Sequence, residues 1–280
     1  MSNHIAIVTD STADIPDELL RDNNINIVNN LIIIDGRSYE DRIEISRQEF
    51  YERLPGLNSF PTTATASSGA YEKIYDTLLH QGFENIISIH ASRKLSGIYN
   101  AACLAAQKFG DQIKVIDSQM ISLGLGFQVI AAADAARQGL PLQNIILLLN
   151  NVYDRIKLIA MLDTLEFVRR SGRVHWVRAR IGDALRIKLL LEVKSGEVLS
   201  LGQTRTRFKG VSRLINILNN LGNLEKLAIL HTNAEQDAIS LLKSIKNHIA
   251  TTPLLVNVTT VIGSHVGPNG LGFAALVEQK

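Results

Sequence analysis

The sequence predicts a two-lobed α/β protein, with a mainly parallel sheet flanked by helices in the first lobe and a mixed sheet with helices in the second. Short apolar runs typical of strands alternate with helical patterns, which favours a parallel sheet covered by helices. A hairpin signal, Lys194-Ser-Gly between two apolar runs, occurs in the second half and indicates antiparallel pairing there. We expect lobes of approximately 1–160 and 161–280.

The first lobe is predicted from four successive units of strand, loop and helix. Pro16 suits a first helical turn, because the N–H that proline lacks is not needed there, and Ser46-Arg-Gln-Glu49 is a capping box. The expected strands are 5–8, 25–34, 85–89 and 113–116, and the expected helices start near 16 and 46 and cover 69–80, 98–109, 121–137 and 142–153.

The second lobe is predicted to combine a hairpin with further strands and helices. We expect strands at 187–193, 197–201, 227–230, 254–261 and 272–277, and helices at 208–221 and 235–249. Four glycines lie among the eleven residues of Ile262–Gly272, which indicates a tightly bent loop, and His265 lies inside it. A histidine there is either a structural hydrogen-bonding group or a ligand contact.

The composition is typical of a soluble globular protein, since 46% of the 280 residues are hydrophobic and 20% are charged. Cys103 is the only cysteine, which excludes an intrachain disulfide and fits a cytoplasmic location. We see no secretory leader and no apolar stretch of membrane-spanning length, so we expect no integral membrane association.

The positive charge is concentrated in one stretch. Arg169–Arg213 contains twelve Lys and Arg residues and three acidic residues, which gives it a charge of +9 in a chain whose net charge is +2. The overall balance is too weak to indicate nucleic acid, but a basic face could receive an acidic partner or a phosphate. A merely solvated basic surface is an equally good interpretation.

Several familiar catalytic motifs are missing. The sequence has no Walker pattern, no GxSxG elbow and no HExxH, and Gly124-Leu-Gly126 lacks the third glycine of a dinucleotide fingerprint. The seven histidines do not have the spacing of metal ligands. We therefore expect no metal and no cofactor.

Three hydroxyl-rich loops each follow a predicted strand or extended segment and precede a helix: Thr9–Thr12, Phe60–Gly69 and Ala91–Gly97. In a parallel sheet such loops gather at the carboxyl ends of the strands, where ligands bind, and helix N-termini there attract anions. The loops could thus hold a carboxylate. Each loop taken alone is also explained by helix capping.

Five short motifs, in order along nearly the whole chain, resemble those of the DegV family of bacterial fatty-acid-binding proteins. They are Leu95-Ser-Gly97, Val115-Ile-Asp-Ser118, Ser122-Leu-Gly-Leu-Gly126, Ser171-Gly-Arg173 and Gly263-Ser-His-Val-Gly267. The resemblance implies a single module over 1–280 that binds one long-chain fatty acid, such as palmitate or oleate, in a tunnel between sheet and helices. It also implies a carrier rather than an enzyme, which presents the acid to a separate fatty-acid kinase.

The resemblance also implies roles for individual residues. Thr63, Ser96 and His265 are expected at the fatty-acid carboxylate. Supporting or nearby positions are Thr62, Gly97 and Ser92, and Arg173 and Arg205 belong to the pattern around the site and the partner-facing surface. Two departures concern the motifs themselves: Thr63-Ala-Thr-Ala66 stands where the family has Thr-Ser-Gln-Pro, and Leu95-Ser-Gly-Ile98 where it has Leu-Ser-Gly-Thr.

Two other functions are compatible with the same residues. One is an acyl hydrolase with Ser96 as nucleophile and His265 as base, although no third group that would orient the histidine is evident. The other is a regulatory interaction module that uses the basic stretch 169–213 and binds lipid only incidentally.

Overall fold

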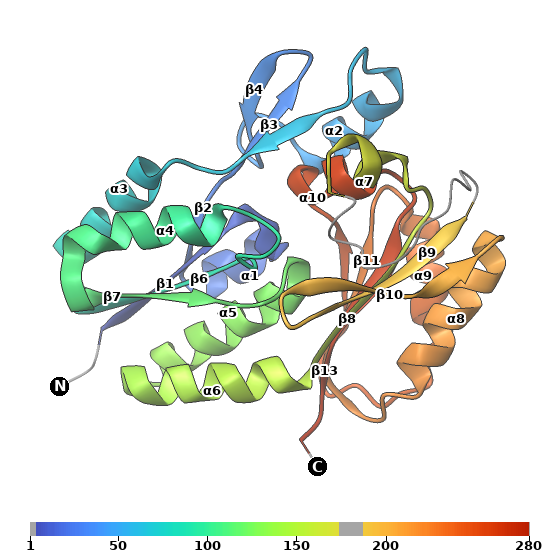
Figure 1. The fold of residues 1–280 in the computed structure, drawn as a ribbon. Coiled ribbons are helices and arrows are strands. Elements are labelled where there is room, and N and C mark those ends of the chain that lie inside the picture. The colour runs from blue at the N-terminus through green and yellow to red at the C-terminus, as the bar shows by residue number, and fades with distance from the viewer. Residues whose placement is uncertain (1–3, 174–186, 280) are drawn as a thin grey trace. The chain divides into compact units, whose positions relative to one another are not determined.

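The computed structural model describes residues 4–173 and 187–279, and internal contacts divide the chain into two compact units (Figure 1). The first unit comprises Met1–Leu31 and Ala64–Asp154, and the second comprises Ile32–Thr63 and Arg155–Lys280. Both units contain a sheet and helices, and the α/β prediction is confirmed.

The division differs from the expected consecutive lobes, 1–160 and 161–280, because residues 32–63 belong to the second unit. These residues form an apolar cluster with Phe167; its buried members are Ile32, Ile34, Ile45, Phe50, Tyr51 and Leu54. Hydrogen bonds add to this attachment: the Tyr51 hydroxyl donates to the Val258 carbonyl over 3.1 Å, and Thr260 Oγ1 donates to Asp41 Oδ1 over 2.6 Å. Tertiary packing of this kind is not visible in local sequence patterns.

The first unit contains a four-stranded sheet of order β2-β1-β6-β7, in which all pairs are parallel. Its strands are β1 Ile5–Asp10, β2 Ile25–Val28, β6 Asn85–His90 and β7 Ile113–Asp117. Its α-helices are α1 Asp17–Asp22, α3 Ser68–His80, α4 Ile98–Ala106, α5 Ser122–Arg137 and α6 Leu142–Arg155, the last of which ends at the unit boundary. The predicted parallel sheet is confirmed.

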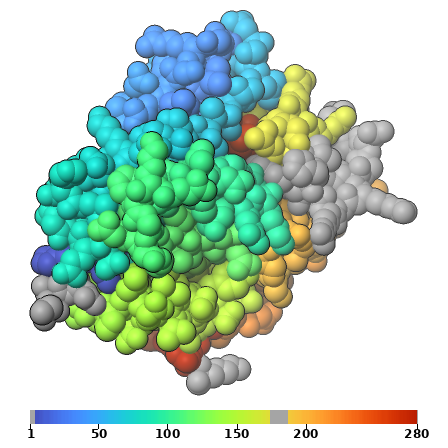
Figure 2. Space-filling model, turned by 60° about the vertical axis from the view of Figure 1, so that its left-hand side comes forward, coloured from blue at the N-terminus to red at the C-terminus, as the bar shows by residue number. Residues whose placement is uncertain are grey.

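Helices cover both faces of this sheet. Helices α3 and α4 pack on one face and α5 on the other (Figure 1). The outer surfaces of α3 and α4, in cyan and green, and of α6, in yellow-green, are seen in Figure 2. Helix α5 is buried almost all round, because its sequence is apolar or small on every side.

The extended run predicted at 25–34 is two strands rather than one. Strand β2 ends at Val28, and β3, Leu31–Ile34, joins β4, Arg37–Glu40, and β5, Thr62–Ala64, in a separate three-stranded sheet. Between them, the buried Asn30 uses its side chain to contact Asp10 and Ser11. These hydrogen bonds hold the chain where it leaves the parallel sheet.

The second unit contains a six-stranded mixed sheet of order β10-β9-β8-β13-β11-β12. The strands are β8 Ile156–Leu162, β9 Lys188–Lys194, β10 Glu197–Thr204, β11 Leu224–His231, β12 Leu254–Asn257 and β13 Leu271–Val277. Strands β11 and β12 are parallel, and the other neighbours are antiparallel. The predicted hairpin is confirmed, with positive φ at Ser195 and Gly196 in its two-residue turn.

Helices α8 Arg207–Asn219 and α9 Glu235–Lys243 pack on one face of the mixed sheet through a core that includes Leu214, Leu241 and Phe273. The helix expected at 235–249 therefore ends earlier, at Lys243. The other short helices of this unit are α2 Arg47–Arg53, α7 Glu166–Arg170 and α10 Thr260–Val266. The predicted capping box is confirmed, since Ser46 Oγ accepts from the Glu49 N–H.

The prediction of a strand over 254–261 followed by a glycine-rich loop was wrong in its second half. Strand β12 ends at Asn257, and Thr259 Oγ1 accepts the Ile262 N–H at the start of α10. His265 thus lies in the last turn of a helix rather than in a loop. Gly263 is required in this helix, because a Cβ there would overlap the Tyr51 hydroxyl.

Among the helices of residues 4–173 and 187–279, none is both long enough and apolar enough to cross a membrane.

Gly126 offers a direct test of the packing of α5. A Cβ at this position would lie 2.6 Å from the Ala13 carbonyl oxygen and 2.6 Å from Leu123 Cδ2, so we expect Gly126→Ala to destabilise the protein by about 1–3 kcal/mol. Urea denaturation measures the effect. Gly69→Ala is the matched control, since Gly69 is exposed in α3 and its added methyl meets only Ser67 Oγ at 3.7 Å. Equal stabilities of the two variants would contradict this packing.

Candidate functional site

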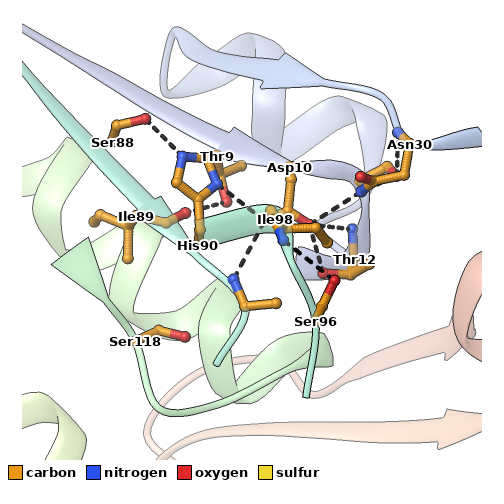
Figure 3. A network of polar contacts seen from close by, with 12 residues as sticks. Thr9, Asp10, Thr12, Asn30, Ser88, Ile89, His90, Ser96, Ile98 and Ser118 are labelled. Atoms are coloured by element: carbon orange, nitrogen blue, oxygen red, sulfur yellow. Dashed lines mark hydrogen bonds and ion pairs between the residues drawn. The ribbon is translucent and has the colours of Figure 1, made fainter. Parts of the chain in front are cut away.

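A fully buried carboxylate, that of Asp10, lies at the carboxyl end of β1 in the middle of the parallel sheet (Figure 3). Its Oδ1 accepts from the Thr12 N–H at 3.0 Å, from Thr12 Oγ1 at 2.5 Å and from Asn30 Nδ2 at 3.4 Å. Its Oδ2 lies 3.0 Å from His90 Nδ1 and accepts the Ala91 N–H at 3.3 Å. Donors from the ends of three strands therefore converge on one group.

Asp10 is ionised in this setting. Burial alone would raise the pKa of its carboxyl, but the hydrogen bond and charge of His90 and the hydrogen bonds of Thr12 lower that pKa overall. Since the carboxylate accepts, His90 Nδ1 carries the proton between them. The two side chains form a buried hydrogen-bonded contact in which both carboxylate oxygens accept hydrogen bonds.

The network continues from His90 through the sheet. His90 Nε2 lies 2.6 Å from Ser88 Oγ, which lies 2.7 Å from the Tyr75 hydroxyl. The order Asp, His, Ser resembles a hydrolytic relay. However, Ser88 is completely buried, and burial raises the pKa of Tyr75, so the relay ends on a protonated phenol inside the protein. This chain of contacts orders the core and offers no reactive hydroxyl to a substrate.

Asp10 also connects two hydroxyl-rich loops through hydrogen bonds. Asn30, which donates to Asp10, accepts the Ala66 N–H at 3.2 Å through its Oδ1, and Ala91 begins the loop that leads to Ser96. A Cβ at Gly97 would lie only 3.7 Å from Thr65 Cγ2, so the two loops are neighbours. The expectation that these loops gather at the carboxyl ends of the strands is therefore correct for this unit.

Ser96 is half-buried immediately before α4, where its Oγ accepts the Ile98 N–H at 3.3 Å (Figure 3). A hydroxyl that accepts one hydrogen bond can still donate its own proton to a ligand. Ser92, by contrast, is fully buried and its Oγ accepts the Lys94 N–H at 3.2 Å, so it shapes the loop. Gly97 is the exposed N-cap of α4.

In the second unit the structure brings together two predicted residues that lie 202 positions apart. Thr63 Oγ1 on β5 is 2.9 Å from His265 Nε2 on α10. Burial lowers the pKa of His265 to about 4, and the positive charge of Arg173 contributes to this shift. At neutral pH the imidazole is uncharged, and the pair forms a neutral hydrogen-bonding group.

The remaining predicted residues of this unit lie in different settings. Thr62 is exposed, and as a strand neighbour of Thr63 it points to the opposite face of β5. Arg173 lies close to His265, and its Nη1 donates to the Ser171 carbonyl over 2.7 Å. Arg205 is exposed between β10 and α8.

The buried network around Asp10 was missed by the sequence interpretation, which treated Thr9–Thr12 only as a hydroxyl loop. The available signal was a carboxylate, Asp10, two residues after the apolar run Ile5–Val8, matched by His90 directly after Ile86–Ile89. Such residues in neighbouring strands of a parallel sheet lie side by side, and they are rarely buried unless paired.

The structure also contains a cavity of about 830 Å³ in the first unit, at the amino ends of β1 and β2. Its apolar lining includes Ile5, Ile7, Leu20, Ile25, Leu78 and Phe83. The hydroxyl loops are at the carboxyl ends of these strands, so this cavity is not the expected tunnel entrance. The tunnel for the fatty-acid tail therefore remains a prediction.

In the part of the chain that is described, no three His, Cys, Asp or Glu residues are grouped to hold a metal ion.

The chain also matches a known protein family. Residues 4–278 match the family model described as "Uncharacterised protein, DegV family". The chain belongs to the DegV family. The resemblance drawn from the five sequence motifs is thereby confirmed.

Individual relatives match over nearly their full length. A DegV domain-containing protein of Listeria innocua is 31% identical over 278 residues, which are 98% of each chain. A solved DegV family protein from Thermus thermophilus, described as fatty-acid-binding, is 28% identical with a TM-score of 0.88 and covers 98% of this chain and all of its own. DegV from Bacillus subtilis, described as a fatty acid binding protein, is 27% identical with a TM-score of 0.85, over 98% and 99% of the two chains.

Removal of the Asp10 charge should show how much the fold depends on it. We expect Asp10→Asn to lower the free energy of unfolding by about 3–5 kcal/mol, because it removes the buried carboxylate that accepts hydrogen bonds from His90 and from the Ala91 N–H. Urea denaturation measures this loss. Asp22→Asn, a change at an exposed position of α1, is the control and should stay within about 0.5 kcal/mol of wild type. A loss as small as that of the control would show that the Asp10 network is dispensable.

The lowered pKa of His265 makes a further prediction about stability and pH. The unfolded chain protonates this histidine near its ordinary pKa of about 6.5, whereas the folded protein does so only near about 4. The contribution of the uncharged His265 to the free energy of unfolding is therefore complete above about pH 6.5, and it is lost as the pH falls towards 4. Between about pH 7 and pH 4.5, wild type should lose about 2 kcal/mol more stability than His265→Gln.

The pKa of the buried His231 is also lowered, so His231 adds its own pH dependence to the stability of both proteins. The difference between wild type and His265→Gln therefore reports His265 alone. Urea denaturation at the two pH values supplies the data. Parallel losses in wild type and His265→Gln would mean that His265 is not held uncharged by the fold.

Proposed function

We propose that this protein is a carrier that binds one long-chain fatty acid, such as palmitate or oleate. The observation that carries the proposal is the uncharged pair formed by the half-buried Thr63 and the buried His265. The relatives from Thermus thermophilus and Bacillus subtilis, both described as binding fatty acids, support it.

The pair suits a carboxylate because it can donate without a formal charge. When His265 Nε2 carries the proton, it donates to Thr63 Oγ1, and the threonine hydroxyl then donates outward to the ligand. In this proposal Ser96 supplies a second hydroxyl to the same carboxylate. Hydroxyl donors fix the head group while leaving a carboxylate oxygen uncovered by any guanidinium.

Affinity in this proposal comes mainly from the alkyl tail. Burial of each methylene contributes about 0.8 kcal/mol, so a tail of roughly fifteen methylenes releases on the order of 10 kcal/mol before the costs of association. The head-group contacts contribute less and determine orientation. The tail would occupy a tunnel between a sheet and its helices.

The proposed role is presentation of the bound acid to a separate fatty-acid kinase, and not catalysis by this chain. An uncovered carboxylate oxygen is what such a kinase would phosphorylate. Arg173 and the exposed Arg205 are proposed to receive the partner. We place this activity in the cytoplasm, in keeping with a chain that has a single cysteine.

A titration with oleate tests the function. We expect the delipidated protein to bind one oleate per chain, and Thr63→Ala and Ser96→Ala each to weaken binding roughly tenfold, as befits one hydrogen bond to a charged group. The loss of oleate affinity in the double variant should be smaller than the product of the two single losses, because both hydroxyls are proposed to bind the same carboxylate.

Matched controls are the exposed hydroxyls of Thr77 on α3 and Ser240 on α9, whose replacement by Ala should leave affinity unchanged. Wild-type protein that ignores oleate would refute the proposal. Turnover of a chromogenic acyl ester that disappears in Ser96→Ala would instead establish the hydrolase.

A further inference from the structure

The ring of Phe167, on α7, contacts two other segments of the second unit. It meets Phe60, with ring centroids 4.9 Å apart and planes inclined by 59°. It also lies against Gly267, where a Cβ would overlap the ring. Phe167 also packs against the apolar cluster that includes Phe50 and Tyr51.

These two neighbours belong to the segments that carry the neutral pair. Phe60 lies three residues before Thr63, and Gly267 lies two residues after His265 and ends α10 with a φ of 76°. The ring therefore contacts both the segment that carries Thr63 and the segment that carries His265. Any side chain at 267 would both strain the backbone and displace the ring.

The same helix also leads directly to Arg173. The Ser171 N–H donates to the Phe167 carbonyl over 2.9 Å, and the Arg173 N–H donates to the Val168 carbonyl over 3.0 Å. On the outer side, the Arg170 guanidinium lies 4.1 Å from the centroid of the Phe60 ring. Phe167 thus connects Phe60 to α7, and the backbone hydrogen bonds connect α7 to Arg173.

We propose that Phe167 is a positioning residue for the carboxylate site: its ring holds the segments of Thr63 and His265 at their hydrogen-bonding separation and places Arg173 beside them. This inference rests on the proposed function, because the site it serves is the one proposed to hold the carboxylate. It assigns a role to an aromatic side chain that contributes no hydrogen bond to the ligand.

Two variants test the inference. Phe167→Ala removes the ring, and Phe167→Leu keeps apolar bulk against the cluster but removes the aromatic contact with Phe60. We expect oleate affinity to fall roughly tenfold or more in Phe167→Ala and several-fold in Phe167→Leu, and to return in Phe167→Tyr, which restores the ring. Urea denaturation of each variant reports its stability.

A second readout needs no ligand. The ring nitrogens of His265, assigned in ¹⁵N spectra by the loss of their signals in His265→Gln, report its pKa in the free protein. That pKa should rise from about 4 towards the ordinary value in Phe167→Ala, because water reaches the ring and Arg173 moves away, and it should be restored in Phe167→Tyr.

The matched control is Leu242→Ala, a change to a residue packed on the core of α8 and α9 in the same unit. It should lower stability without altering affinity or the His265 titration. If the Phe167 variants behave like this control, Phe167 is only a core residue and the inference fails. If wild type binds no oleate, the proposed function fails, while the His265 titration still decides whether Phe167 positions the pair.

Discussion

The buried carboxylate of Asp10 is the contact on which the arrangement of the first unit depends. An ionised group in the middle of a sheet is tolerated only when its oxygens are fully hydrogen-bonded, and here the donors come from the ends of β1, β2 and β6. The residues that supply these donors lie at the start of the loops that follow the strands or hydrogen-bond to those loops. The requirement to satisfy one charge therefore fixes the loop that carries Ser96.

The two buried histidines at these sites show opposite uses of the same side chain. His90 faces the Asp10 carboxylate and donates to it from Nδ1, so it is part of a structural hydrogen-bond network. His265 faces a threonine hydroxyl near Arg173, and burial keeps it uncharged. A neutral group beside a hydroxyl can accept or donate, and it suits a ligand that must be bound and released. The neighbour, rather than the residue type, decides the role.

The sequence was sufficient for the parallel sheet and the hairpin at Lys194–Glu197, and family motifs singled out Thr63 and His265, which lie within hydrogen-bonding distance in the structure. It was not sufficient where long-range packing decides the outcome. Residues 32–63 join the second unit because Phe50 and Tyr51 pack near Phe167, and Asn30 ends β2 because Asp10 binds its amide. Segment 260–266 is helical because Thr259 caps it, although Gly263 and the glycines that follow the segment favour a loop. These contacts join positions far apart in the chain.

We propose that the protein holds a single fatty acid by its carboxylate. Native mass spectrometry of the protein purified without delipidation can detect such a complex. We expect a species whose mass exceeds that of the 280-residue chain by one long-chain fatty acid, and a chain without that increment after organic extraction. A protein that carries no such adduct, and gains none when oleate is added, would show that it does not bind a fatty acid.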